Sequence, residues 1–110
     1  FVHFGSEGIY CYSVDGKQVW KASLGPMPNW GLGPGTSPVL FEDLVIIRGD
    51  NDGGETSFLA ALSKKDGKVV WKTKRTNWTS WATPILVKHD NAWQLITAAR
   101  EATISYDPKT

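Results

Sequence analysis

Several residues and patterns that define whole classes of protein are scarce in this 110-residue chain. A single cysteine excludes an internal disulfide framework, and two histidines are too few to complete a Cys/His zinc cluster with it. The formal net charge is only +1, so no general electrostatic attraction to nucleic acid or to an acidic membrane is expected. No apolar run approaches the roughly 20 residues of a membrane-spanning helix, and no signal-peptide pattern is visible at Phe1.

Aromatic residues are abundant. They make up 12% of the chain, and six of them are tryptophans. Together with the balanced charge, this content excludes a disordered chain. The length by itself fits one ordinary domain of about 100–150 residues.

An internal repeat changes that interpretation of the length. The segment from Leu59 to Trp71, Leu-Ala-Ala-Leu-Ser-Lys-Lys-Asp-Gly-Lys-Val-Val-Trp, is echoed upstream from Tyr10 to Trp20 and, cut short, from Thr103 to Thr110. The two complete copies are 51 positions apart when measured between their tryptophans. A second echo joins Thr36-Ser-Pro-Val-Leu40 to Ala82-Thr-Pro-Ile-Leu86. Periods of this size are typical of four-stranded propeller blades or of helical HEAT-type pairs.

The residue types between the echoes favour strands. Short runs of β-branched or bulky apolar residues alternate with polar turns, and no window has the i, i+3, i+4 spacing of an amphipathic helix. The Asp-Gly turns at Gly16 and Gly67 are strong hairpin signals. Ten strands are predicted, at residues 2–5, 9–13, 18–22, 38–41, 44–47, 58–62, 69–73, 84–87, 93–98 and 102–106.

Grouping these strands by repeat gives an all-β fold of about two and a half four-stranded antiparallel blades of a β-propeller. Residues 1–25 form a partial blade lacking its inner strand, 36–75 a complete blade, and 80–110 a partial blade lacking its outer strand. Propellers have about four to eight blades. Open sheet edges and apolar faces need cover, so we expect the remaining blades of a longer chain, or other copies of this one, to pack against the segment.

Trp20 and Trp71 occupy one structural position seen twice, on the outermost strand of a blade. An indole on a sheet face can bury against the next blade, and its ring N–H can find a backbone carbonyl. We therefore predict that these two tryptophans, with the turn glycines Gly16 and Gly67, dock one blade on another.

The repeat resembles the PQQ-type β-propeller repeat, in which the outer-strand tryptophan docks between blades and the glycine makes the turn. The match is strongest at Leu59–Trp71, good at Ile9–Trp20 and partial at Thr103–Thr110. The family implies three functions: a pyrroloquinoline quinone- and calcium-dependent dehydrogenase, a non-catalytic scaffold similar to the outer-membrane-assembly lipoprotein, or a sugar- or peptide-binding sensor. It also implies a periplasmic or otherwise extracytoplasmic bacterial setting.

One cysteine weighs against the dehydrogenase. Such enzymes carry two adjacent cysteines that close a disulfide over the quinone, whereas Cys11 stands alone within a strand. It is better explained as a small buried apolar residue. We therefore expect neither the quinone nor calcium as a cofactor of this segment.

The predicted loops differ in length on the two faces of the blades. The turns at residues 14–17, 42–43, 63–68 and 88–91 are tight, whereas the loops at 24–36, 49–56 and 74–81 are long and, with 99–101, share the opposite face. Long loops on a rigid scaffold are a common place for binding residues. We predict a binding surface on that face, formed by Trp30, Arg48, Asp50, Asp52, Glu55, Arg75, Trp78, Trp81 and Arg100.

The sequence predicts neither a metal site nor a catalytic pair. The acidic segment Gly49–Glu55 supplies oxygen ligands of the kind calcium prefers, but its spacing is not that of an EF-hand loop and its composition suits an ordinary turn, so no metal site is predicted. No nucleophile and base are paired by the sequence, since neither His3 nor His89 has an indicated partner. The expected function is a non-catalytic scaffold or binding domain for a protein or ligand, with no nucleic-acid partner.

Overall fold

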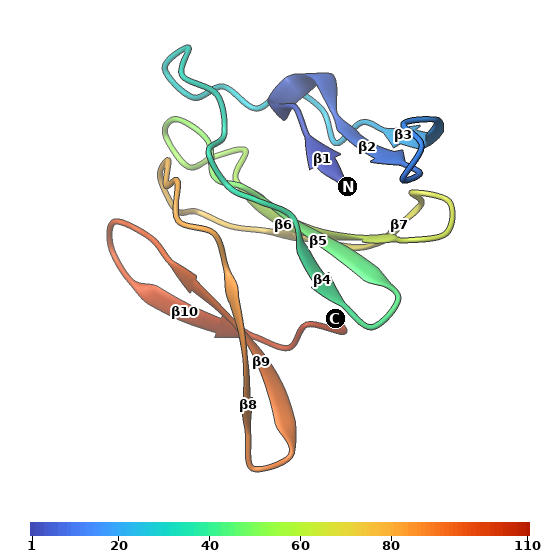
Figure 1. Ribbon diagram of the computed structural model, residues 1–110. Helices are drawn as coiled ribbons and strands as arrows, with labels where there is room; N and C mark the ends of the chain where they lie inside the picture. Colours follow the sequence, from blue (N-terminus) through green and yellow to red (C-terminus); the bar gives the residue numbers. More distant parts are fainter.

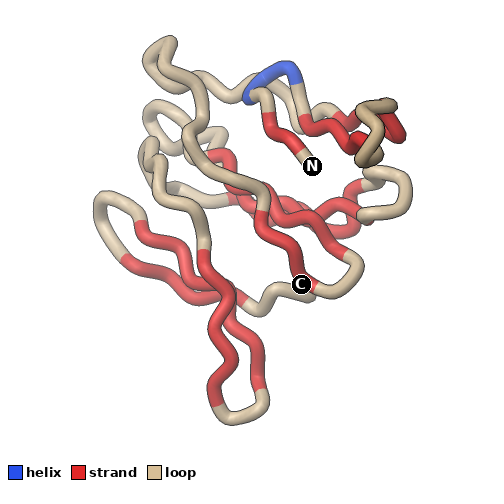
Figure 2. Tube along the Cα trace, viewed as in Figure 1, coloured by secondary structure: helices blue, strands red, loops and turns tan.

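The computed structural model describes all 110 residues, and nearly all of its regular structure is β-strand (Figures 1 and 2). One turn of 3-10 helix, η1 (Gly5–Glu7), was not predicted from the sequence. All ten predicted strands are present, and their bounds differ from the prediction by at most two residues. The strands are β1 (Val2–His3), β2 (Ile9–Tyr12), β3 (Gln18–Ala22), β4 (Val39–Phe41), β5 (Leu44–Gly49), β6 (Phe58–Ser63), β7 (Val69–Lys74), β8 (Ile85–His89), β9 (Ala92–Ala98) and β10 (Thr103–Tyr106).

The strands form three separate antiparallel sheets, none of them closed. The first has the order β1-β2-β3, the middle one β4-β5-β6-β7, and the third β10-β9-β8. Each strand pairs with the strand that follows it within its sheet, because tight turns join antiparallel neighbours. The turn glycines Gly16 and Gly67 both have positive φ, of 85° and 72°, a conformation that glycine adopts without steric cost.

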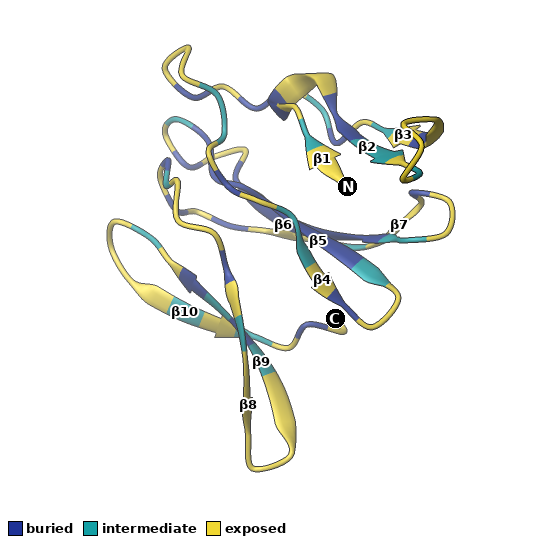
Figure 3. Cartoon of the chain, in the orientation of Figure 1, coloured by how far each residue is buried: buried dark blue, intermediate teal, exposed yellow.

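The two central strands of the middle sheet, β5 and β6, are covered on both faces, which explains their continuous apolar runs (Figure 3). Successive side chains of a strand point to opposite faces. In β5, Val45 and Ile47 therefore join the core shared with the first sheet, while Ile46 joins the core shared with the third. In β6, Ala60 and Leu59 divide in the same way.

Trp20 links the first sheet to the middle one. Its indole is buried, and the ring N–H donates a 2.9 Å hydrogen bond to the carbonyl of Lys64 in the β6–β7 turn. The ring lies directly over Gly67, where an added Cβ would fall 2.6 Å from Cε3 of Trp20. Backbone and indole therefore meet at a distance that only glycine permits.

Trp71 holds the equivalent position in the middle sheet but is less completely engaged. It packs against the second core and is half-buried, and its ring N–H has no hydrogen-bond partner. Gly16 also differs from Gly67, because nothing lies within 4 Å of the place where its Cβ would be. The repeated sequence thus produces one complete docking contact, between Trp20 and Gly67.

The three sheets follow one another in a flat body with extents of 40 × 40 × 19 Å. The outward faces of the first and third sheets keep large apolar side chains exposed, among them Val2, Tyr12, Ile85 and Val87. Loops rather than strands occupy the side of the body where the candidate site lies.

Candidate functional site

The three long connections lie together on one side of the molecule, with the short β9–β10 turn beside them. Figure 1 shows the β3–β4, β5–β6, β7–β8 and β9–β10 connections at the left of the view, away from the other hairpin turns. The β3–β4 and β5–β6 loops are joined by the amide of Asp52, which donates to the carbonyl of Pro28 at 3.0 Å. This arrangement was predicted from the alternation of loop lengths in the sequence.

Three of the predicted site residues form a buried charge cluster. Asp50 lies between two arginines: its Oδ2 is 2.6 Å from Nη2 of Arg48, and its Oδ1 is 2.9 Å from Nε of Arg75. All three side chains are fully buried. The structure therefore places these three residues beneath the surface of the long-loop face.

The cluster connects the middle sheet to the third sheet. Nη1 of Arg75 donates to the hydroxyl of Thr97 in β9 at 2.9 Å and to that of Tyr106 in β10 at 2.8 Å. Nη1 of Arg48 donates to the carbonyl of Ala82 at 2.8 Å. Buried charges need such compensation, because leaving water costs each ion several kcal/mol. These partners give the cluster a structural role beneath the loops.

Asp52 holds three loops together. Its Oδ2 accepts a hydrogen bond from the backbone N–H of Trp30 at 2.6 Å, and its Oδ1 accepts one from the hydroxyl of Thr79 at 2.8 Å. Trp30 has a φ of 48°, a left-handed conformation that costs a non-glycine residue about 1–2 kcal/mol. The carboxylate of Asp52 therefore helps to hold the backbone of Trp30 in this strained position.

Replacing Asp52 with asparagine is expected to loosen these loops. An amide offers one oxygen acceptor where the carboxylate offers two, so one of the two contacts is lost, at a cost of about 1 kcal/mol. In hydrogen-exchange measurements the Trp30 amide should exchange about five-fold faster in D52N than in the unsubstituted protein. The control is Glu55→Gln, at an exposed carboxylate that makes no hydrogen bond or ion pair. Equal exchange rates in the two variants would contradict this role for Asp52.

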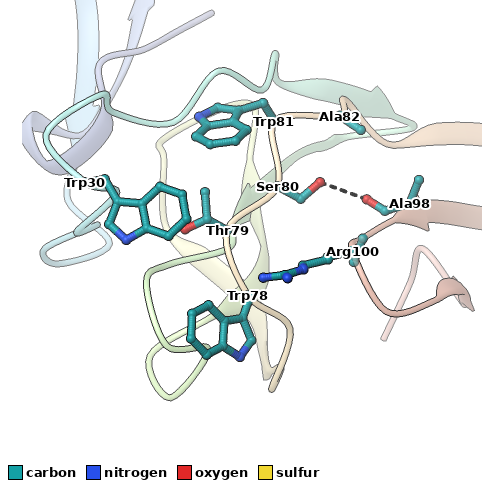
Figure 4. A pocket seen from close by; sticks show the side chains of 9 residues that line it. Trp30, Trp78, Thr79, Ser80, Trp81, Ala82, Ala98 and Arg100 are labelled. Carbon is teal, nitrogen blue, oxygen red and sulfur yellow. Dashed lines mark hydrogen bonds between the residues drawn. The ribbon is translucent and has the colours of Figure 1, made fainter.

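Four predicted site residues, three tryptophans and one arginine, line a single pocket of about 450 Å³ (Figure 4). The residues Trp30, Trp78 and Trp81 are 63%, 44% and 42% exposed. Arg100 comes from the β9–β10 turn, and its guanidinium extends between Ser80 and Trp78. The full lining is Trp30, Trp78, Thr79, Ser80, Trp81, Ala82, Ala98, Ala99 and Arg100.

The indole of Trp81 is fixed before any ligand arrives. Its ring N–H donates to the carbonyl of Gly33 at 3.1 Å. The ring lies against the backbone at Gly35, where an added Cβ would fall 2.9 Å from Cδ1 of Trp81. The ring of Trp30 stands 6.4 Å from that of Trp81, between centroids, and is tilted by 58°.

Buried and exposed residues alternate along the β7–β8 loop, and this alternation places Trp78 at the surface. Its neighbours Asn77 and Thr79 are both buried and bonded: the carbonyl of Asn77 accepts from the hydroxyl of Ser57 at 2.6 Å, and Thr79 donates to Asp52. In this extended segment the residue between two buried ones faces solvent. Ser57 and Thr79 were missed by the sequence reasoning, and their only signal was a short polar side chain in a long loop.

Glu55 lies apart from the tryptophan pocket. It is exposed and lines a separate hollow of about 350 Å³ with Lys72 and Lys74. The oxygens of Asp50 and Asp52 are engaged in the contacts given above, so the acidic segment does not direct its carboxylates to one point. No three His, Cys, Asp or Glu side chains gather as a set of metal ligands.

Neither the cysteine nor the two histidines of the chain line the pocket. Cys11 is a free, half-buried thiol that packs against the first core. Burial lowers the pKa of His3, and neither of its ring nitrogens has a hydrogen-bond partner. No helix of this protein is both long and apolar enough to span a bilayer.

Comparisons with protein-family models, with curated proteins and with solved structures found no match.

Proposed function

We propose that this chain is a stretch of a PQQ-like β-propeller, acting as a non-catalytic scaffold or binding domain through its long-loop face. Support for the architecture comes from the repeat at Leu59–Trp71 and from the flat series of three antiparallel sheets. The apolar faces left exposed on the outer sheets suit further blades of the same propeller, or other copies of the chain, as packing partners.

One observation carries the binding role: four of the nine predicted site residues, from three different loops, line one pocket of about 450 Å³. Ligand pockets commonly have volumes of roughly 300–1,000 Å³ and a mainly apolar lining with few polar groups. Large exposed aromatic surfaces are costly to leave open in a soluble domain and mark interaction sites. The family resemblance adds an extracytoplasmic location to the proposal.

The experiment is a binding screen of the intact protein that contains this chain, against glycan and peptide arrays. Trp78→Ala is expected to weaken binding of any captured ligand by about 30-fold, because a buried tryptophan contact is worth about 2 kcal/mol. The control is Val14→Ala, at an exposed apolar residue in the β2–β3 turn. A ligand that binds W78A and W30A as tightly as the unsubstituted protein would contradict the proposal.

The same preparation tests the dehydrogenase alternative. Pyrroloquinoline quinone and calcium are added to the intact protein, and oxidation of alcohols or sugars is followed with a redox dye. Dye reduction that depends on both additions would replace the non-catalytic proposal. Absence of reduction together with a ligand on the array supports it.

A further inference from the structure

The tryptophan pocket has a single charged group, and that group is positive. Arg100 is exposed and forms no ion pair with an acidic side chain, whereas Arg48 and Arg75 are both neutralised by Asp50. Neither Glu101, the exposed neighbour of Arg100 in the chain, nor Asp52, which is occupied by Trp30 and Thr79, is part of the lining. The pocket therefore attracts an anionic group and disfavours a cation such as a quaternary ammonium.

The arrangement of the indoles indicates the shape of the uncharged part of the ligand. Trp30 and Trp81 meet at 58°, so they form an open angle rather than the two parallel walls that a flat base or quinone needs for a sandwich. A puckered pyranose presents C–H groups to one indole face while its edge remains free for a second. Trp81 is held rigid by Gly33 and Gly35, so little conformational entropy is lost when it stacks.

The hydroxyl groups of the lining are already occupied. Thr79 donates to Asp52 at 2.8 Å, and Ser80 donates to the carbonyl of Ala98 at 3.0 Å. These two side chains therefore cannot donate hydrogen bonds to the neutral hydroxyl groups of a ligand. The charged donor of the lining is Arg100, whose five N–H groups form a planar fork that matches a carboxylate.

We propose that this pocket binds an acidic saccharide, a pyranose ring stacked on the indoles with its carboxylate bound by Arg100. The inference rests on the proposed binding function and names its ligand class. Uronic acids combine the two features in one residue: an apolar ring face and a planar carboxylate at the ring edge. The volume of about 450 Å³ lies in the range of small-ligand sites.

The test uses tetrasaccharides of galacturonate, glucuronate and mannuronate, each paired with its fully methyl-esterified form. Calorimetry with the intact protein should show at least one acid binding about ten-fold more tightly than its ester, because a charge-assisted contact at an exposed site is lost on esterification. Raising the salt concentration should weaken binding of the acid and leave binding of the ester unchanged.

Arg100→Gln should remove the preference for the acid while leaving the affinity for the ester unchanged. Lys74→Gln is the matched control, since it removes an exposed cation outside the pocket. Arg100 is exposed, so its replacement is not expected to affect folding, and an unfolding curve verifies this. Trp78→Ala should weaken acid and ester equally.

The outcomes distinguish two levels of the proposal, the binding function of the pocket and the acidic saccharide as its ligand. Equal affinity for acid and ester, a preference retained by R100Q, or no binding of any tetrasaccharide overturns the acidic-saccharide inference. The binding function itself survives such a result if W78A loses another ligand found on the arrays. If the acid binds but neither W78A nor R100Q alters its affinity, both levels fail.

Discussion

Replacing Asp50 with asparagine is expected to lower the free energy of unfolding by about 3–5 kcal/mol, because two buried guanidinium groups lose their only counter-charge. Arg48 and Arg75 are both fully buried against this carboxylate, at 2.6 and 2.9 Å. Asparagine has nearly the same size as aspartate, so the loss of stability measures the effect of removing the charge and not that of creating a cavity. Urea unfolding of the intact protein measures it.

Two further variants define what the Asp50 result means. Asp43→Asn makes the same chemical change at an exposed carboxylate without an ion pair, and should change stability by less than about 0.5 kcal/mol. Replacing Arg48, Asp50 and Arg75 together with Met, Leu and Met should restore most of the stability lost in D50N, because no buried charge is then left unpaired. A D50N protein as stable as the D43N control would refute the buried-cluster interpretation.

Trp20→Ala is the second substitution with a large expected effect, a loss of about 3–5 kcal/mol. The indole fills the space between the first and middle sheets, and its N–H satisfies the carbonyl of Lys64. Truncation leaves both a cavity and an unsatisfied acceptor. Val19→Ala, at an exposed neighbour on the same strand, is the control. Chemical unfolding followed by circular dichroism measures the difference.

The two turn glycines provide a double-mutant test of the same contact. Gly67→Ala combines a positive φ with a Cβ placed 2.6 Å from the Trp20 ring, whereas Gly16→Ala has only the positive φ. G67A should therefore destabilise by about 1–3 kcal/mol more than G16A. In a W20A background this excess should disappear, because the obstructing ring is gone. An excess that persists in W20A would show that Gly67 acts independently of Trp20.

The secondary structure could be predicted from the sequence because its determinants are local. Asp-Gly turns and alternating β-branched runs specify hairpins over a few residues, so all ten strands were located. The placement of the long loops on one side followed from the same alternation, since successive connections of a meander lie at opposite ends of the strands. Four of the nine predicted site residues then met in one pocket.

The sequence did not predict which charged residues are buried, because burial depends on residues far away in the chain. Arg75 and Arg100 each follow closely on the end of a strand, β7 and β9 respectively. Arg75 is nevertheless buried, with Thr97 and Tyr106 of another sheet as partners, whereas Arg100 is exposed. Asp50 and Asp52 are two positions apart and serve different purposes, one neutralising arginines and the other fixing loops. No local pattern distinguishes the members of either pair.

Five of the six tryptophans show which properties the sequence determines and which depend on the tertiary structure. Repetition alone determined that Trp20 and Trp71 share a position on the outer strand and that Trp30, Trp78 and Trp81 belong to loops. Only the packing of one sheet on the next decided that Trp20 finds both a carbonyl and a glycine, whereas the ring N–H of Trp71 has no acceptor. The reason is physical: a strand's face is set by the two-residue period of its own backbone, but what covers that face comes from a separate sheet.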